Sequence, residues 1–319
     1  MREIVISVDL GGTKTAAALV DAAGNLVSEK VRVPTPGQQG GEAMLDAMAV
    51  AISQQYAQLG GDRLVGIGVG TAGAVDTERG VIVSATETVT GWLGTDLVSG
   101  LRRRLDWAAE LPIQVQNDVD AHAVGENWRG AGAGAASMLM LAVGTGIGAA
   151  FCLDGAVWRG AHHMAGEVGS LRVRFNDGLP EQGSSEAPAV FEANAAGPAI
   201  AQIYRQLGGR AEVRRGQDVM ELAKAGDQTA DRAIHGLGRR VGRVLGWLVL
   251  ALDPEVVVLG GGVPTPRTSW WTGLTDELRA GLPQILREVP VKRATQRNNA
   301  ALLGAGRDAF RLAGVATAE

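Results

Sequence analysis

One supersecondary unit occurs twice in this chain, and this repeat constrains the fold more than any other feature. Residues 4–31 and 138–158 share the same order: a strand, a glycine-rich turn, a second strand, a turn containing Asp, and a third strand. Their identity is low, but their layout matches. A repeat of a whole unit predicts two related lobes. The length of 319 residues agrees with this prediction, because one hydrophobic core rarely organises so long a chain.

The rest of the chain shows the periodicities of an α/β protein. Apolar spacing predicts helices over residues 41–59, 93–105, 118–128, 229–252 and 300–312, and buried strands over 64–70, 113–116 and 255–263. We predict an N-terminal lobe of residues 1–117 plus 300–319 and a C-terminal lobe of residues 118–299. A cleft between two lobes is the default place for a ligand.

Composition excludes several classes of protein. The net charge of -4 argues against a surface that neutralises nucleic acid. Cys152 is the only cysteine, so neither an intrachain disulfide nor a cysteine-built zinc site is expected. The longest apolar stretch, residues 247–252, is far shorter than a membrane span, and the N-terminus lacks a secretory leader pattern. We expect a cytoplasmic protein with neither nucleic acid nor membrane as a partner.

Two glycine turns that follow strands are candidate phosphate contacts, because small residues let backbone N–H groups approach a phosphate. Each turn alone is more typical of a tight hairpin, but one turn per lobe could clamp one polyphosphate. A dinucleotide fingerprint would need a helix after the glycines, where strand-like AAFCLD follows, and the chain has no GxxxxGK[ST] loop. A further glycine cluster ends the strand over 255–263. The candidate nucleotide contacts are therefore Gly11, Gly12, Thr13, Lys14, Gly144, Thr145, Gly146, Gly261 and Gly262.

Asp9 ends the first strand immediately before the first glycine turn. A carboxylate there could hold Mg²⁺ directly or through water, because Mg²⁺ prefers oxygen ligands and bridges phosphate oxygens. An Asp in this place could also serve only the turn.

Ordered motifs across nearly the whole chain resemble the ROK family of sugar kinases and repressors. They are DLGGTKT at 9–15, GVGTAGAVD at 68–76, GW at 91–92, QNDVDAHAVGE at 116–126, AVGTGIG at 142–148, AGEVG at 165–169, FEANAAGPAI at 191–200 and VVLGGGV at 257–263. The resemblance implies an actin-like ATPase fold of the ribonuclease H-like type, with ATP and Mg²⁺ in the interlobe cleft. It also suggests a homodimer.

The resemblance implies roles for the residues around these motifs. Asp118 corresponds to the general base that accepts the proton of the sugar hydroxyl, although the residue could also be a plain helix cap. Asn117, Glu167 and Glu192 correspond to ligands of the sugar hydroxyls.

Two departures from the family pattern change the expected acceptor. Ser170 stands where most members have a His that, together with a CxCG...C cluster, binds zinc, and this chain lacks the cluster, so we expect no zinc site. Thr88 stands where a sugar-contacting Asn is usual, next to Glu87. Glucose is therefore in doubt as the substrate, and an amino sugar or a cyclitol fits the altered pocket.

We therefore predict an ATP-dependent phosphotransferase that acts on a hydroxyl of a hexose or hexose-like sugar. Two alternatives stay open: an ordinary glucokinase, and a sugar-binding sensor without turnover. A family repressor would carry a DNA-binding segment before the first motif, which here begins at Asp9. The sequence leaves undecided the acceptor, the hydroxyl that is phosphorylated, polyphosphate as an alternative donor, and the oligomeric state.

Overall fold

The computed structural model describes residues 1–85, 89–182 and 187–318. The chain forms two compact units. The first comprises Met1–Ala136, Cys152–Ala165 and Thr295–Glu319, and the second comprises Ser137–Phe151 and Gly166–Ala294. Our predicted division after residue 117 differs from these bounds. Helix α3 (Asp118–Arg129) remains in the first unit because it packs along α9 (Ala300–Leu312).

The first unit contains a five-stranded sheet that begins as the predicted meander. Its order is β3 (Val31–Pro34), β2 (Lys14–Asp21), β1 (Glu3–Leu10), β4 (Arg63–Thr71) and β7 (Ile113–Asn117). The pairs β1–β2 and β2–β3 are antiparallel, whereas β1, β4 and β7 run parallel to one another. The carboxyl ends of three strands therefore meet at one edge of this sheet.

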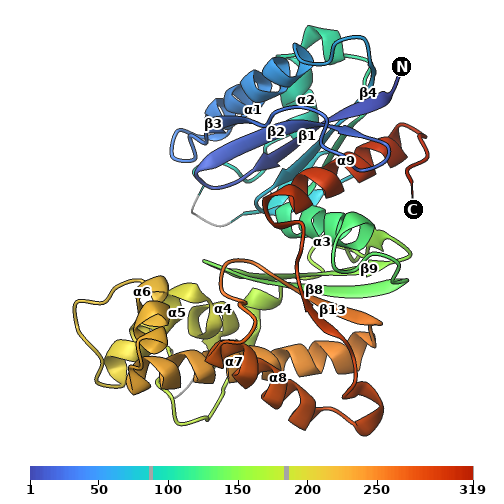
Figure 1. The fold of residues 1–319 in the computed structure, drawn as a ribbon. Helices are drawn as coiled ribbons and strands as arrows, with labels where there is room; N and C mark the ends of the chain where they lie inside the picture. The colour runs from blue at the N-terminus through green and yellow to red at the C-terminus, as the bar shows by residue number, and fades with distance from the viewer. Residues whose placement is uncertain (86–88, 183–186, 319) are drawn as a thin grey trace. The chain divides into compact units, whose positions relative to one another are not determined.

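Helices cover this sheet. Helix α1 (Gly41–Tyr56) contacts β1, β2 and β3, while α9 packs against β4, β1 and β7 (Figure 1). Helix α9 lies very close to the sheet at Gly68, where a Cβ atom would meet the Ala305 carbonyl oxygen at 2.0 Å. The α9 bounds agree with the predicted helix over 300–312.

The remaining elements of the first unit differ from the sequence prediction. They are β5 (Ala74–Asp76), β6 (Val81–Ser84), α2 (Leu97–Arg102), η1 (Asp106–Ala108) and η4 (Arg297–Asn299). The helix predicted over 93–105 is only six residues long. It starts late because the Asp96 side chain accepts a hydrogen bond from the Ser99 backbone and caps the helix there. The β5–β6 hairpin was not predicted.

The second sheet repeats the order of the first, strand for strand. It runs β10 (Ala156–Val157), β9 (Ile147–Leu153), β8 (Ser137–Val143), β13 (Val256–Gly260) and β14 (Val291–Arg293). Strands β8, β13 and β14 are parallel, like β1, β4 and β7. The internal repeat predicted from residues 4–31 and 138–158 is thereby confirmed.

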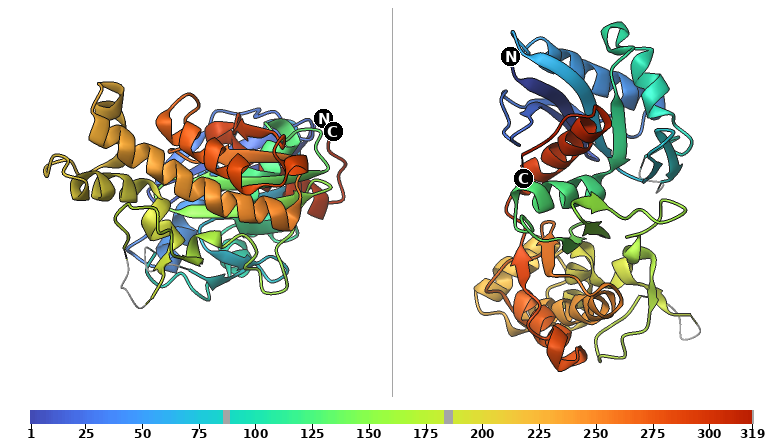
Figure 2. Two further views of the ribbon diagram at one scale, coloured as in Figure 1. Left: turned by 90° about the horizontal axis from the view of Figure 1, so that it is seen from below. Right: turned by 90° about the vertical axis from the view of Figure 1, so that its right-hand side faces the viewer.

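Helices α4 to α8 belong to the second unit. They are α4 (Phe191–Ala195), α5 (Gly197–Gln206), α6 (Gly216–Lys224), α7 (Gln228–Leu252) and α8 (Ser269–Gly281), with the short elements η2 (Val168–Ser170), β11 (Arg172–Val173), β12 (Ala189–Val190) and η3 (Gln284–Leu286). Helices α7 and α8 lie side by side (Figure 2). Glycines let them approach, since a Cβ on Gly238 would lie 2.0 Å from the Trp270 carbonyl oxygen. Within the described residues, the helices are all too short or too polar to cross a membrane.

Candidate active site

In the first unit, the carboxyl edge of the parallel strands brings the predicted acidic residues together. Asp9 on β1 is paired with Gly70 on β4, and Gly70 is paired with Gln116 on β7, one residue before Asn117. A Cβ on Gly70 would lie 3.0 Å from the Ala121 Cβ and 3.9 Å from the Asp118 Cα, so glycine at this position lets the first turn of α3 pack closely on β4. Asp9 and Asp118 therefore lie at the same edge, two strands apart.

Asn117 is the N-cap of α3. Its side-chain oxygen accepts hydrogen bonds from the backbone N–H groups of Val119 (2.7 Å) and Asp120 (3.3 Å). Its amide nitrogen donates to the Gly73 carbonyl at 2.9 Å. One amide N–H remains for a ligand, and the cap fixes the first turn of the helix.

Asp118 is the first residue of α3 and has an unusual electrostatic environment. One carboxylate oxygen accepts a hydrogen bond from the Val119 backbone N–H at 2.9 Å. Burial raises the pKa of the Asp118 carboxyl, His122 opposes this effect, and the nearby charge of Asp9 adds to it. A carboxyl group with a raised pKa is a stronger proton acceptor once it is ionised.

Asp9 has a raised pKa for the same main reason, its burial, which outweighs the charges of His122 and Lys30. Among the described residues, no hydrogen bond reaches the Asp9 side chain. Two neighbouring, half-buried carboxyl groups fit a Mg²⁺ ion, which takes one or two carboxylates and keeps water and phosphate ligands. The described residues contain no group of three or more His, Cys, Asp or Glu side chains placed to bind a metal.

His122 is a residue that sequence reasoning missed. It lies one helical turn after Asp118, with its Nδ1 2.8 Å from the Asp118 carbonyl oxygen. A positive charge on its ring favours the ionised forms of both carboxyl groups. The spacing of four residues on one helix was the available signal, because such residues share a helix face.

The first glycine turn joins β1 to β2. Gly11 donates a backbone hydrogen bond to the Lys14 carbonyl at 3.2 Å, as in a tight hairpin. Gly12, Thr13 and Lys14 are exposed, and a Cβ on Gly12 would meet no atom within 4 Å. The turn thus presents open backbone close to Asp9.

In the second unit, the two other glycine clusters lie together. Val263 donates a backbone hydrogen bond to the Val143 carbonyl at 3.0 Å, which joins the end of β13 to the end of β8. Gly261 has φ of 85°, and a Cβ there would lie 2.2 Å from that same carbonyl oxygen, so only glycine fits. Gly262 is exposed, and a Cβ there would meet no atom within 4 Å.

A cavity of about 810 Å³ opens beside these clusters. Three of the predicted phosphate contacts line it: Gly144, Thr145 and Gly262. Its other walls were not predicted and come mainly from α5 and α6. They are Gly197, Pro198, Ile200, Arg214, Arg215, Gly216, Gln217, Met220, Glu221, Lys224, Val263 and Thr265.

Glu192 on α4 supports the second glycine turn. One of its carboxylate oxygens accepts a hydrogen bond from the Ile147 backbone N–H at 2.7 Å. A Cβ on Gly146 would lie 2.5 Å from that oxygen, so glycine is required for this contact. Glu167 is the N-cap residue of the short helix η2, Ser170 is its last residue, and both are exposed. Thr88 and Glu87 lie outside the described residues.

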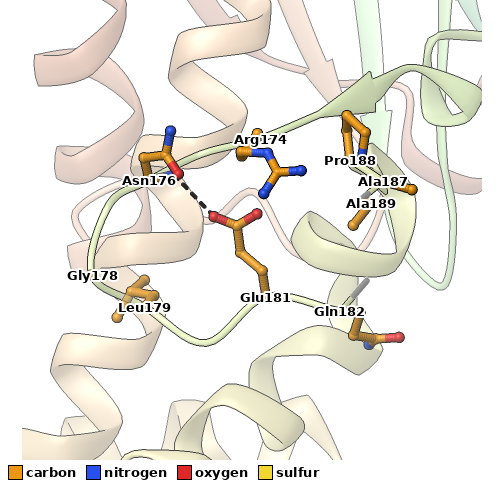
Figure 3. Close-up of a pocket in the computed structure, with 9 residues that line it drawn as sticks. All are labelled: Arg174, Asn176, Gly178, Leu179, Glu181, Gln182, Ala187, Pro188 and Ala189. Carbon is orange, nitrogen blue, oxygen red and sulfur yellow. Dashed lines mark hydrogen bonds between the residues drawn. The ribbon is translucent and has the colours of Figure 1, made fainter. Parts of the chain in front are cut away.

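The segment that follows Ser170 forms a small pocket of about 370 Å³. Arg174 and Glu181 point toward each other across it, and a Glu181 carboxylate oxygen accepts a hydrogen bond from the Asn176 backbone N–H at 2.9 Å (Figure 3). In this part of the chain, the described residues are held by side-chain to backbone hydrogen bonds.

A model described as the ROK family matches residues 5–308. The chain belongs to the ROK family. A glucokinase of Halalkalibacterium halodurans is 30% identical to it over 94% of this chain and 93% of the relative. The family resemblance inferred from the motifs is confirmed.

Solved structures of ROK proteins confirm the actin-like α/β fold. The ROK hexokinase from Thermus thermophilus is 36% identical, with a TM-score of 0.79 over 97% of this chain and 98% of that one. A ROK family glucokinase from Streptomyces griseus, solved in complex with glucose and AMPPNP, is 28% identical, with a TM-score of 0.77 over 97% of this chain and 99% of that one.

Proposed function

We propose that this ROK protein is an ATP-dependent kinase that phosphorylates a hydroxyl of a hexose or hexose-like sugar. The environment of Asp118 carries the proposal: a carboxyl with a raised pKa, fixed at a capped helix start, beside a second carboxyl and a glycine turn. The glucokinase and hexokinase relatives support the class of reaction.

Asp118 acts as the general base in this proposal. Phosphoryl transfer depends mainly on alignment and on stabilising the charge of the phosphoryl group, and the protein must also accept the proton of the attacking hydroxyl. Asn117 fixes the helix start that carries Asp118 and offers its free N–H to the sugar. Glu167, Glu192 and Ser170 supply further polar contacts to the acceptor, and Thr88 completes the proposed set.

ATP is the proposed donor. The 810 Å³ cavity of the second unit has the size of a small-molecule site and joins an apolar wall to the backbone of two glycine turns. We assign the adenine to the apolar wall, which includes Pro198, Ile200 and Met220, and the phosphates to the turns at 11–14, 144–146 and 261–262. The S. griseus relative binds the ATP analogue AMPPNP.

Asp9 is the proposed Mg²⁺ ligand, directly or through water. Mg²⁺ bound with ATP neutralises charge on the phosphate oxygens. Asp9 itself contributes a buried negative charge at the end of β1, next to the exposed turn. The homodimer and the cytoplasmic location expected from the sequence remain predictions of the same proposal.

An ADP-release assay with a panel of sugars tests the proposal. We expect ADP release that requires both a sugar and Mg²⁺, with a background rate without sugar that is far lower. Binding of a sugar without any ADP release across the panel would instead identify a non-catalytic sensor.

A further inference from the structure

A groove of about 890 Å³ in the first unit is lined by four arginines. Pro112 and Gln114, at the beginning of β7, form part of its wall, whereas Asn117 and Asp118 lie at the other end of that strand. The groove is therefore separate from the candidate active site. Its charged lining residues are Arg79, Arg102, Arg159, Arg311, Glu78 and Asp308.

The positive charges of the groove are incompletely compensated. Arg159 and Arg311 both pair with the Asp308 carboxylate, each at 3.1 Å, and Arg159 has a second acidic neighbour in Asp120 at 3.4 Å. Within the described part of the chain, Arg102 has neither an ion pair nor a hydrogen bond from its side chain, and Arg79 lies 4.0 Å from Asp76. A local excess of positive charge contrasts with the net charge of -4 of the chain.

A fifth guanidinium, that of Arg307, does not line the groove but lies beside Arg311, over the Trp128 ring. Arg307 and Arg311 both approach Gly155, where a Cβ would lie 3.1 Å and 3.0 Å from their nitrogens. The Nε and Nη1 atoms of Arg307 are buried and make no hydrogen bond in the described structure. Like charges that crowd one wall of a concave surface attract anions.

We propose that this groove binds the phosphate dianion of a small metabolite. Guanidinium groups offer paired N–H donors that match phosphate oxygens, and several of them can converge on one phosphate. The volume lies in the range of small-molecule sites and exceeds what a phosphate ion alone would fill. The structure assigns recognition to Arg102 and Arg79, which have the fewest internal partners.

Arg159 connects the groove to the catalytic residues. Its Nη2 donates a hydrogen bond to the Gln116 side-chain oxygen at 2.8 Å, and its Nε lies 3.4 Å from an Asp120 carboxylate oxygen. Gln116 and Asp120 flank the pair formed by Asn117 and Asp118 in the sequence. A bound anion that attracts Arg159 weakens these contacts, so occupancy of the groove lowers kcat.

Titration calorimetry with two probes, inorganic phosphate and glucose 6-phosphate, tests the binding step without relying on activity. The test variant is Arg79→Ala combined with Arg102→Ala, both exposed positions, and the control is Arg103→Ala, an exposed neighbour that does not line the groove. We expect the double variant to bind at least about tenfold more weakly than the wild type, and the control to bind like the wild type.

Tighter binding of glucose 6-phosphate than of inorganic phosphate supports a sugar phosphate as the source of the dianion, and equal affinity supports free phosphate. Phosphate that binds at the glycine turns is retained in the double variant, so the measured loss belongs to the groove. The proposal is overturned if the double variant binds both probes as tightly as the wild type, or if the wild type binds neither at millimolar concentration. Sugar phosphate that binds at the active site of a sugar kinase is retained in both proteins, so the decisive quantity is the loss of binding between the wild type and the double variant.

Discussion

The Arg240 guanidinium is fully buried and forms two hydrogen bonds with the Asp177 carboxylate, at 2.7 Å and 2.9 Å. Its remaining N–H groups reach the carbonyl oxygens of Asn194, Leu179 and Pro180, each at 3.2 Å. One side chain of α7 therefore holds the 177–180 loop and the helix α4 that carries Glu192. Burial is the largest single influence and opposes ionisation of Asp177, but the hydrogen bonds and charge of Arg240 together with the backbone N–H of Leu179 outweigh it and lower the pKa of this carboxyl.

Replacing Arg240 by Met should lower the free energy of unfolding by about 3 to 5 kcal/mol, because the Asp177 charge would stay buried without a partner. Arg239→Met is the matched control. That neighbouring arginine is 44% exposed and pairs with Glu277, so its loss should cost no more than about 1 kcal/mol. Chemical denaturation of the three proteins measures both values, and equal losses would show that the buried pair has no special weight.

Glu192 is expected to influence the ATP site as well as the sugar site, because its carboxylate holds the glycine turn through Ile147. Glu192→Ala should raise the KM for ATP by roughly tenfold, the effect of losing one hydrogen bond to a charged group. Glu192→Gln keeps an acceptor oxygen and should restore most of the ATP affinity. Steady-state kinetics with each substrate varied in turn separate the two sites. A KM for ATP that is unchanged in both variants would restrict Glu192 to the sugar.

As the pH is lowered, kcat/KM should begin to fall at a pH above the ordinary pKa of an aspartate. A general base works only when it is ionised, and burial raises the pKa of the Asp118 carboxyl. Activity is therefore retained at high pH and lost as the pH falls through this raised pKa. A profile that stays flat down to the usual aspartate pKa of about 3.9 would contradict the assigned environment.

The raised pKa of Asp118 also predicts how the stability of the folded protein depends on pH. A folded state that raises the pKa of a carboxyl binds its proton more tightly than the unfolded state does, so stability is lost as the pH rises through the folded pKa. Asp118→Asn removes this ionisation and keeps the side-chain size. Its melting temperature relative to the wild type should therefore increase as the pH rises from the ordinary aspartate pKa of about 3.9 through the raised pKa of Asp118. A difference that is constant or decreases with pH would be inconsistent with a buried ionised Asp118.

Glucose should be a poor acceptor for this protein. If Ser170 and Thr88 replace the His and Asn that the family resemblance implies for the sugar pocket, two polar partners are lost. A buried hydroxyl without its partner costs roughly 1 to 3 kcal/mol, so glucose should be about one to two orders of magnitude poorer in kcat/KM than the true substrate. The panel comprises glucose, mannose, N-acetylmannosamine, glucosamine, 3-amino-3-deoxyglucose and a C7 cyclitol. Ser170→His should improve glucose selectively. Efficient use of glucose, with no better acceptor in the panel, would restore an ordinary glucokinase.

The sequence predicted the elements with strong periodicity and missed those that depend on tertiary context. The helix over 300–312 and the helix that ends at Leu252 were placed correctly, because long amphipathic patterns specify a helix on their own. Helix α8 was missed although Thr268 caps its start, which is a signal that a sequence can offer. The β5–β6 hairpin is too short to show an alternation.

Some residues of the candidate site could likewise be predicted from the sequence, whereas their contacts within the protein could not. Asp9 was predicted from its place at the end of the first strand and Asp118 from the resemblance to the ROK motif, and the parallel strands β1, β4 and β7 bring both to one edge of the sheet. The hydrogen bond of Glu192 to Ile147 and the proximity of His122 to two carboxyl groups depend on three-dimensional packing. A motif names such residues but does not say which contacts they make within the protein.

The turnover of Asp118→Asn is the most direct measurement of the proposed chemistry. The amide keeps the size of the side chain and can still accept the Val119 hydrogen bond, but it cannot take the proton of the sugar hydroxyl. With the best acceptor of the panel and saturating ATP and Mg²⁺, we predict that kcat falls by about 100-fold or more while sugar binding, measured by calorimetry, is retained. An unchanged kcat in a folded variant that binds the sugar would contradict the assignment of Asp118 as the general base.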